Sequence, residues 1–305
     1  MTFTPSRREL GLGIAMAMAI PSLIVGAGAV QATDAKLRIH RHDAARPFPV
    51  NAYIVEGNDG LVVVDAPLTE SSAAALRKRI EVLAKPLRAV LLTHSHPDHY
   101  AGIGVLAAGW DLPIVALAAV DDVVRRDDAA KDALSAPLFG AEWPRNRGFA
   151  SQRVRDGDRL DYGGGLVFTV MDIGPAESLH DSVWILNSER PIAFFGDLVY
   201  PLTHCYMADG QIDRWRRATE RLQSELAEET LLYVGHGPPP TPALLSWQRL
   251  YLNRFEEALR ATDWRDPDAA TANVVRVIRA FVPNEQLLFF LEYSIRPNAR
   301  RLGLL

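Results

Sequence analysis

The sequence contains almost no cysteine: Cys205 is the single one among 305 residues. One cysteine cannot form an internal disulfide bond, so no disulfide framework holds this fold together. One cysteine also excludes a thiolate-rich zinc site. A metal site in this chain would therefore draw mainly on histidine and carboxylate side chains.

The chain also has no surplus of positive charge. Its 33 Lys and Arg residues are outnumbered by 37 Asp and Glu residues, which gives a formal net charge of -4. No basic run occurs outside the N-terminus. Because nucleic acids are bound through clustered lysine and arginine, we predict that this protein does not bind nucleic acid. Its composition, 48% hydrophobic and 23% charged, is ordinary for a globular protein.

The longest apolar run lies near the N-terminus, at residues 11–30, after Arg7 and Arg8 and before Ala32. A positive start, an apolar run and a small-residue cleavage site are typical of an export signal. The paired arginines resemble the twin-arginine signal of bacteria. We predict a signal peptide at 1–32 and a periplasmic or secreted protein, with no stable membrane insertion after cleavage. An uncleaved membrane anchor is the alternative, because the run is long enough to span a bilayer.

Strands and helices alternate twice along the mature chain, in similar order. The predicted strands are 37–42, 51–56, 61–65, 88–92, 113–117, 166–173, 183–186, 192–195 and 231–234. The predicted helices are 71–83, 102–108, 212–225, 244–261, 270–281 and 286–305. Residues 120–149 are polar and irregular, which is typical of an insertion or lid. Two packed α/β halves fit this order, so we expect a domain at 33–240 and a helical extension at 241–305 packed on it.

A dense group of polar residues follows the predicted strand at 88–92: His94, His96, Asp98 and His99. Buried histidines and carboxylates at this density would repel or stay unpaired unless positive charge lies among them. Imidazole and carboxylate suit zinc, iron or manganese. At a turn after a strand, His94 and His96 can hold one ion while Asp98 and His99 hold a second.

This H-x-H-x-D-H stretch resembles the signature of the metallo-β-lactamase superfamily, and the resemblance extends over roughly residues 37–240. It implies an α/β fold, the four-layer αββα sandwich, with the metals at one edge between two sheets and a C-terminal helical extension. It also implies that Asp65 supports the metal-binding loop, that Asp197 bridges both ions and that His236 is the last ligand of the second ion.

The third ligand of the first ion departs from the family pattern. The family usually has Gly-His at this point, whereas this chain reads Gly174-Pro175-Ala176-Glu177-Ser178-Leu179-His180. Alignment on Gly174-Pro175 gives Glu177, and alignment on histidine gives His180 with a shorter loop before the next strand. We favour Glu177, since glutamate has this role in family members that hydrolyse alkyl sulfates. His180 would then contact substrate or support the site.

The resemblance implies a binuclear hydrolase, in which a hydroxide bridging two divalent ions attacks an ester-like bond. Zinc is expected, with manganese or iron as alternatives. Lactone or another ester is the first expectation, because a tyrosine placed like Tyr200 contacts the substrate carbonyl in family lactonases. A β-lactam, thioester, sulfate ester or phosphate ester stays open. Asp98 is expected to steer or accept a proton, and His204 to line the substrate pocket.

Two other functions are compatible with the same residues. One is an iron-dependent oxidoreductase on the same fold, and the other is a non-catalytic periplasmic accessory protein. The complete ligand set favours the hydrolase over both. The expected partner is a small-molecule substrate, and the sequence leaves its identity, the metal and the oligomeric state open.

Overall fold

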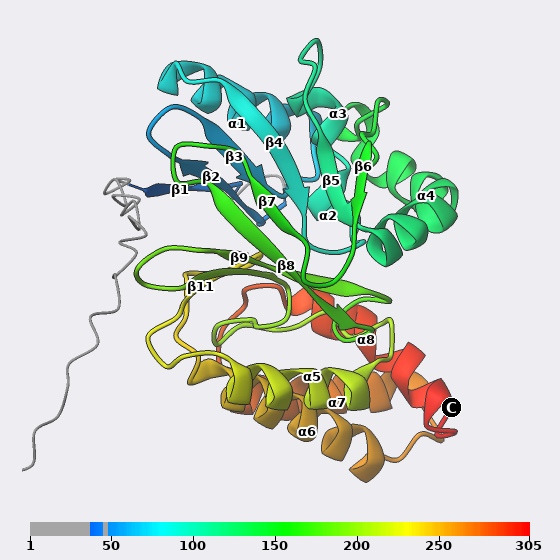
Figure 1. Cartoon of the computed structure of the whole chain (residues 1–305). Helices are drawn as coiled ribbons and strands as arrows, with labels where there is room; N and C mark the ends of the chain where they lie inside the picture. The colour runs from blue at the N-terminus through cyan, green and yellow to red at the C-terminus, as the bar shows by residue number, and fades with distance from the viewer. Residues whose placement is uncertain (1–36, 45–47) are drawn as a thin grey trace, which may run out of the picture. The chain divides into compact units, whose positions relative to one another are not determined.

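The computed structural model describes residues 37–44 and 48–305 (Figure 1). The predicted signal peptide at 1–32 lies outside the described residues, so its cleavage stays a prediction. Among the described helices, none is both long and apolar enough to cross a membrane.

The first sheet has six strands in the order β1-β2-β3-β4-β5-β6. Neighbours are antiparallel from β1 to β3 and parallel from β3 to β6. The strands are β1 Arg38–Asp43, β2 Asn51–Glu56, β3 Leu61–Val64, β4 Leu87–Leu92, β5 Ile114–Leu117 and β6 Gln152–Val154. Every residue of β2 and β3 is buried, because both faces of these strands are covered.

The second sheet has five strands in the order β11-β10-β9-β8-β7. Only the pair β10–β11 is parallel among the described strands of this sheet. The strands are β7 Arg159–Asp161, β8 Val167–Gly174, β9 Asp181–Leu186, β10 Ile192–Gly196 and β11 Leu231–Val234. The strands predicted from apolar runs in this half lie within two residues of these bounds.

The two sheets face each other and helices cover their outer sides, as Figure 1 shows. The helices are α1 Glu70–Leu83, α2 Pro97–Tyr100, α3 Ile103–Leu106, α4 Ala118–Phe139, α5 Ile212–Glu225, α6 Leu244–Ala261, α7 Pro267–Phe281 and α8 Leu288–Arg301. Side chains from both sheets share one buried core, where the rings of Tyr53 and Phe194 lie 5.5 Å apart. The predicted αββα sandwich is therefore confirmed, with helices at its C-terminal end.

The prediction of an irregular segment at 120–149 is wrong for its first two thirds, which form α4. Val120, Val123 and Val124 are buried at helical spacing, and Arg125 donates to Asp121 one turn back at 2.8 Å. The many charged residues lie around a narrow apolar stripe. Because this stripe is short, the overall polarity concealed the helical period.

The C-terminal helices share a second core with the strands nearest to them. Leu232 and Val234 of β11 belong to the same buried cluster as Tyr251 and Phe255 of α6 and Ile295 of α8. The helices at 244–301 therefore pack on the second sheet. The domain boundary predicted at residue 240 stays a prediction.

Candidate metal centre

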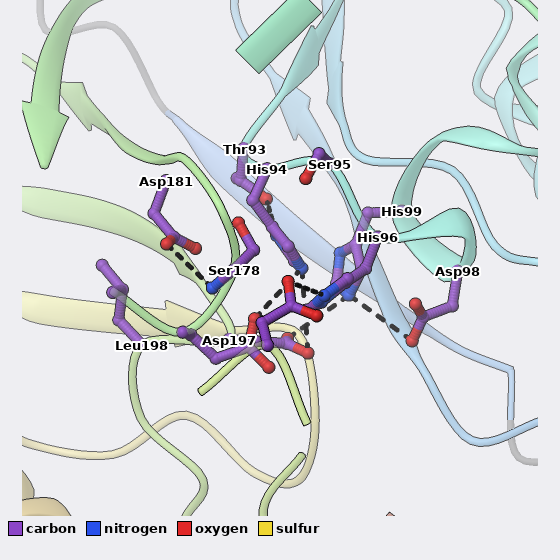
Figure 2. A network of polar contacts seen from close by, with 12 residues as sticks. Thr93, His94, Ser95, His96, Asp98, His99, Ser178, Asp181, Asp197 and Leu198 are labelled. Carbon is purple, nitrogen blue, oxygen red and sulfur yellow. Dashed lines mark hydrogen bonds and ion pairs between the residues drawn. The ribbon is translucent and has the colours of Figure 1, made fainter. Parts of the chain in front are cut away.

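The predicted metal ligands lie at the carboxyl ends of strands from both sheets. His94, His96, Asp98 and His99 follow β4, and the last three flank or begin the short helix α2. Asp197 follows β10, His236 follows β11, and Glu177 lies in the loop between β8 and β9. Figure 2 shows the rings of the β4 loop turned toward Asp197.

Three groups of ligand atoms form there, the atoms of each lying within 4.8 Å of one another, and two of the groups contain Asp197. The first group is His94, His96, Glu177 and Asp197. The second group is Asp98, His99, Asp197 and His236. Asp197 is common to both groups, so the geometry allows two ions with one carboxylate between them.

Six buried atoms of these side chains have no hydrogen-bond partner, although buried polar atoms are nearly always paired. They are His94 Nε2, Asp98 Oδ2, His99 Nε2, Glu177 Oε2, Asp197 Oδ1 and His236 Nε2. The Glu177 Oε2 atom also lies 3.0 Å from Nδ1 of His96, close enough for an ion pair but without hydrogen-bond geometry. Such an approach is expected of two ligands of one ion, so these residues fit a pair of divalent cations.

Neighbouring groups fix the orientation of the imidazole rings. Asp65 accepts from Nδ1 of His99 at 2.8 Å and from the backbone N–H of Thr93 at 2.9 Å. Nδ1 of His236 lies 2.6 Å from the Pro49 carbonyl oxygen. These bonds leave the Nε2 atoms of His99 and His236 facing the cluster. The role predicted for Asp65, support of the metal-binding loop, fits this placement.

Two glycines allow the strand ends to approach one another here. A Cβ atom on Gly235 would lie 2.0 Å from Oδ1 of Asp197 and 2.4 Å from Cε1 of His99. Gly196 has a φ of +52°, and a Cβ there would meet Nδ1 of His94 at 2.8 Å. Each glycine therefore makes space that the ligand side chains occupy.

The structure places Glu177, and not His180, in the first group. Oδ2 of Asp181 accepts from the backbone N–H groups of Ala176 and Ser178, at 3.2 and 3.0 Å, which turns the loop so that Glu177 points inward. His180 instead lies with Nε2 2.8 Å from Oδ1 of Asp172, outside both groups. The geometry of this loop therefore brings Glu177, rather than His180, to the other candidate ligands.

Tyr200 is fully buried, and its hydroxyl lies 2.9 Å from Oε1 of Glu177 and 2.8 Å from Oδ2 of Asp197. Burial, together with these two carboxylates, raises the pKa of Tyr200 well above its usual value. The hydroxyl therefore stays protonated. It connects the carboxylate of Glu177 to that of Asp197, the residue common to both groups. The predicted contact with a substrate carbonyl stays a prediction, and the hydroxyl lies between two carboxylates.

His204 is buried away from the cavity beside the metal groups. Its ring nitrogens lie 3.2 Å from the Tyr251 hydroxyl and 3.0 Å from the Asn284 carbonyl oxygen. It is not among the residues that line that cavity, so the predicted pocket role does not fit its position. Both partners belong to the C-terminal helical region, which packs over the segment that contains His204.

From its place in the loop after Asp197, Asp209 is a candidate for lining the pocket; it does line that cavity, and its Oδ2 also lies 3.3 Å from Nε2 of His96. This contact leaves Nδ1 of His96 facing Glu177. The residue pair is 113 positions apart in the chain, so no spacing pattern marks it. The sequence shows only that Asp209 is a carboxylate in the loop after Asp197, which is itself a predicted ligand.

Burial and charge shift the pKa values of several ligand side chains in different directions. Burial raises the pKa of Glu177 to about 8, and burial also lowers the pKa of His94 well below its usual value. Although burial opposes it, Asp197 raises the pKa of His236 to about 9. Divalent cations would displace the protons of Glu177 and His236, as metal binding to histidine and carboxylate generally does.

A cavity of about 380 Å³ opens beside the cluster. His96, Asp98, Asp197 and Tyr200 contribute to its lining. The volume lies in the range of small-molecule sites in proteins. A small substrate can therefore reach the two groups of ligand atoms.

Comparison with known proteins connects this site to one family. The family model described as the metallo-beta-lactamase superfamily matches residues 45–236. A crystal structure of a beta-lactamase domain protein from Burkholderia ambifaria has a TM-score of 0.64 at 18% identity, over 86% of this chain and 84% of that one. At that identity the likeness concerns the fold.

Two curated relatives are similar over shorter stretches. A hydroxyacylglutathione hydrolase of Bdellovibrio bacteriovorus is 28% identical over 151 residues, 49% of this chain and 49% of that protein. A linear primary-alkylsulfatase of a Pseudomonas species is 36% identical over 83 residues, 27% of this chain and 12% of that protein. The chain therefore spans about half, or less, of the length of these relatives.

Proposed function

Because the chain belongs to the metallo-β-lactamase superfamily, we propose that it is a binuclear metal-dependent hydrolase that cleaves an ester-like bond. The observation that carries the proposal is the set of six buried ligand atoms without hydrogen-bond partners, arranged in two groups that share Asp197. The hydroxyacylglutathione hydrolase and the alkylsulfatase support hydrolysis in general.

In this proposal, His94, His96 and Glu177 hold the first ion. Asp98, His99 and His236 hold the second, and Asp197 contacts both. Zinc is the first expectation, and the three carboxylates also suit manganese or iron. When bound, two such ions activate a water molecule as the nucleophile and polarise the oxygen of the bond to be cleaved.

The protein groups then orient the reactants and move protons. Oδ2 of Asp98 faces Nε2 of His236 at 3.3 Å, and Asp98 also lines the cavity. Its other oxygen is proposed to accept the proton of the attacking water and deliver it to the leaving group. Tyr200 holds Glu177 and Asp197 in fixed positions through its hydroxyl.

An ester or lactone stays the first proposal for the substrate. The proposal no longer depends on Tyr200 as a carbonyl contact, since its hydroxyl already binds two carboxylates. It depends instead on the cavity beside the cluster and on relatives named as a hydroxyacylglutathione hydrolase and an alkylsulfatase.

Metal content tests the proposal directly. Elemental analysis of the purified protein should find two divalent ions per chain, with one lost in Glu177→Ala and none lost in His180→Ala. A chelator should abolish hydrolysis of p-nitrophenyl acetate, and the same ion should restore it. One iron per chain with oxygen uptake would favour the oxidoreductase, and a protein without metal-binding capacity would overturn the mechanism.

A further inference from the structure

Exposed apolar side chains gather at the rim of the cavity beside the metal groups. Of nine large apolar side chains that are exposed in the described part of the chain, four line this cavity: Leu134, Leu138, Phe289 and Tyr293. Leu138 is 79% exposed and Tyr293 is 67% exposed. Single exposed apolar residues are ordinary, whereas a group of them on one cavity is typical of a ligand site.

These four residues come from two helices that are far apart in the sequence. Leu134 and Leu138 are one turn apart on α4, and Phe289 and Tyr293 are one turn apart on α8. Phe48 lies between the helices, with its ring 5.6 Å from that of Phe289 and 6.3 Å from that of Phe139 on α4. The cavity thus has an apolar wall on two sides.

The apolar wall continues to the metal-binding residues. The ring of Phe290 lies 5.4 Å from that of His236 and 5.5 Å from that of Tyr206. Tyr206 in turn lies 5.0 Å from the ring of His96. A ligand at the cluster would therefore extend along aromatic rings toward the rim.

Away from the ligand residues, acidic side chains outnumber basic ones in the lining of the cavity. Lys131 is the one lysine or arginine among the lining residues, and its Nζ donates to the Ser95 carbonyl oxygen at 2.5 Å. Asp127 and Asp209 line the same cavity. A negatively charged substrate tail would therefore meet more carboxylates than ammonium groups in this part of the cavity, which disfavours it.

We infer that the substrate carries an uncharged apolar chain beside the bond that is cleaved, and that this chain lies between α4 and α8. The cleavage itself rests on the proposed function, whereas binding of the chain does not. Each methylene placed against this wall leaves water, which strengthens binding of both substrate and transition state.

A chain-length series tests the inference. We would measure kcat/KM of the metal-loaded protein for p-nitrophenyl acetate, butyrate, hexanoate and octanoate. The expected rise is about three- to fourfold per methylene, the factor that corresponds to ~0.8 kcal/mol per buried CH₂. The double variant Leu138→Ser/Phe289→Ser should reduce this slope.

Val82→Ser is the matched control, because Val82 is 78% exposed on α1 and does not line the cavity. It should keep the slope of the unchanged protein. If the rates do not depend on chain length but activity is still lost on chelation, the inference of an apolar chain is wrong. The proposed hydrolase function would then still stand.

Calorimetry with butanamide, hexanamide and octanamide tests binding of the apolar chain separately from ester hydrolysis. These neutral probes should bind about three- to fourfold more tightly per methylene even if no ester is hydrolysed, and less steeply in the double variant. If no ester is hydrolysed but the affinity for the amides still rises with chain length, only the proposed function is overturned. Affinities independent of chain length would overturn the inference whatever the esters show.

Discussion

Asp65 is a non-glycine residue with a φ of 61°, a conformation that costs about 1–3 kcal/mol and persists only where the surroundings enforce it. Its carboxylate binds Thr93 through the backbone N–H and the side-chain hydroxyl, and it binds His99 through Nδ1. These bonds join the end of β3 to the loop after β4. The strained residue thus holds the loop on which four of the proposed ligands lie.

The variant Asp65→Asn tests this positioning role. The amide keeps the size of the side chain but cannot accept from both partners as the carboxylate does, so the ring of His99 loses its fixed orientation. We expect about a 10- to 100-fold loss of affinity for one of two ions, measured by competition with a chromophoric chelator. Asp213→Asn, on an exposed carboxylate, is the control. Equal affinities in both variants would limit Asp65 to a structural role.

The variant Tyr200→Phe removes only the hydroxyl that joins Glu177 to Asp197. The ring should remain in place, because it stacks on His236 at 5.4 Å. Hydrogen bonds to charged groups contribute about 1.5–3 kcal/mol, so metal affinity should fall by about tenfold or more in a calorimetric titration. If affinity is kept while KM for an ester rises, the hydroxyl contacts substrate, as predicted from the sequence.

The helix α4 supplies one wall of the cavity, although its polar sequence gave no sign of a helix. Its buried stripe includes Val124, which is 1% exposed. The stripe lies in the first turns of α4 and packs on the first sheet, whereas Leu134 and Leu138 lie in its last turns, at the rim of the cavity. Packing against the sheet therefore decides where these exposed residues lie.

Truncation of the stripe should destabilise the protein. Val124→Ala is expected to lower the free energy of unfolding by about 2 kcal/mol, through lost burial and an unfilled space. Val82→Ala makes the same chemical change on α1 at a residue that is 78% exposed, and should stay within about 0.5 kcal/mol. Urea denaturation measures both, and equal costs would contradict the packing of α4.

Glu56 of β2 ties the first sheet to the end of α1. Its carboxylate accepts from Nζ of Lys85 at 2.7 Å and lies 2.8 Å from Nε2 of His40. Lys85 first and His40 second hold the pKa of Glu56 below its usual 4.5. The ionised form is therefore favoured in the folded protein.

This pair of contacts predicts a pH dependence of stability. A folded pKa below the unfolded one contributes stability above pH 4.5, and that contribution disappears as pH falls through the folded pKa. Glu56→Gln should therefore be less stable at pH 7 by about 1 kcal/mol, and the difference should vanish in acid. Thermal unfolding of both proteins between pH 3 and 7 checks this, and a constant difference would contradict it.

For the whole molecule, export is the main proposal outside the described residues. If residues 1–32 direct the twin-arginine route, the mature protein should begin at Thr33 and occur in the periplasm. Changing Arg7 and Arg8 together to lysine should retain it in the cytoplasm. Cell fractionation and N-terminal sequencing decide this, and a membrane-bound protein that keeps its first residues would establish the anchor instead.

The sequence by itself determined the fold family and most of the proposed ligands. The reason is that these features are local: His94, His96, Asp98 and His99 lie within one stretch of six residues just after a strand, and the strands show as short apolar runs. Strand ends in an αββα sandwich meet at one edge, so the family resemblance was enough to bring Asp197 and His236 to the same place.

Only the tertiary structure decided the features that depend on distant segments. Asp181 turns the β8–β9 loop so that Glu177 points to the cluster while His180 pairs with Asp172. Asp209 reaches His96 across 113 residues. The apolar wall of the cavity exists because α4 and α8 lie on either side of it. No local pattern contains this information, since each contact depends on how two separately formed elements pack against the sheets.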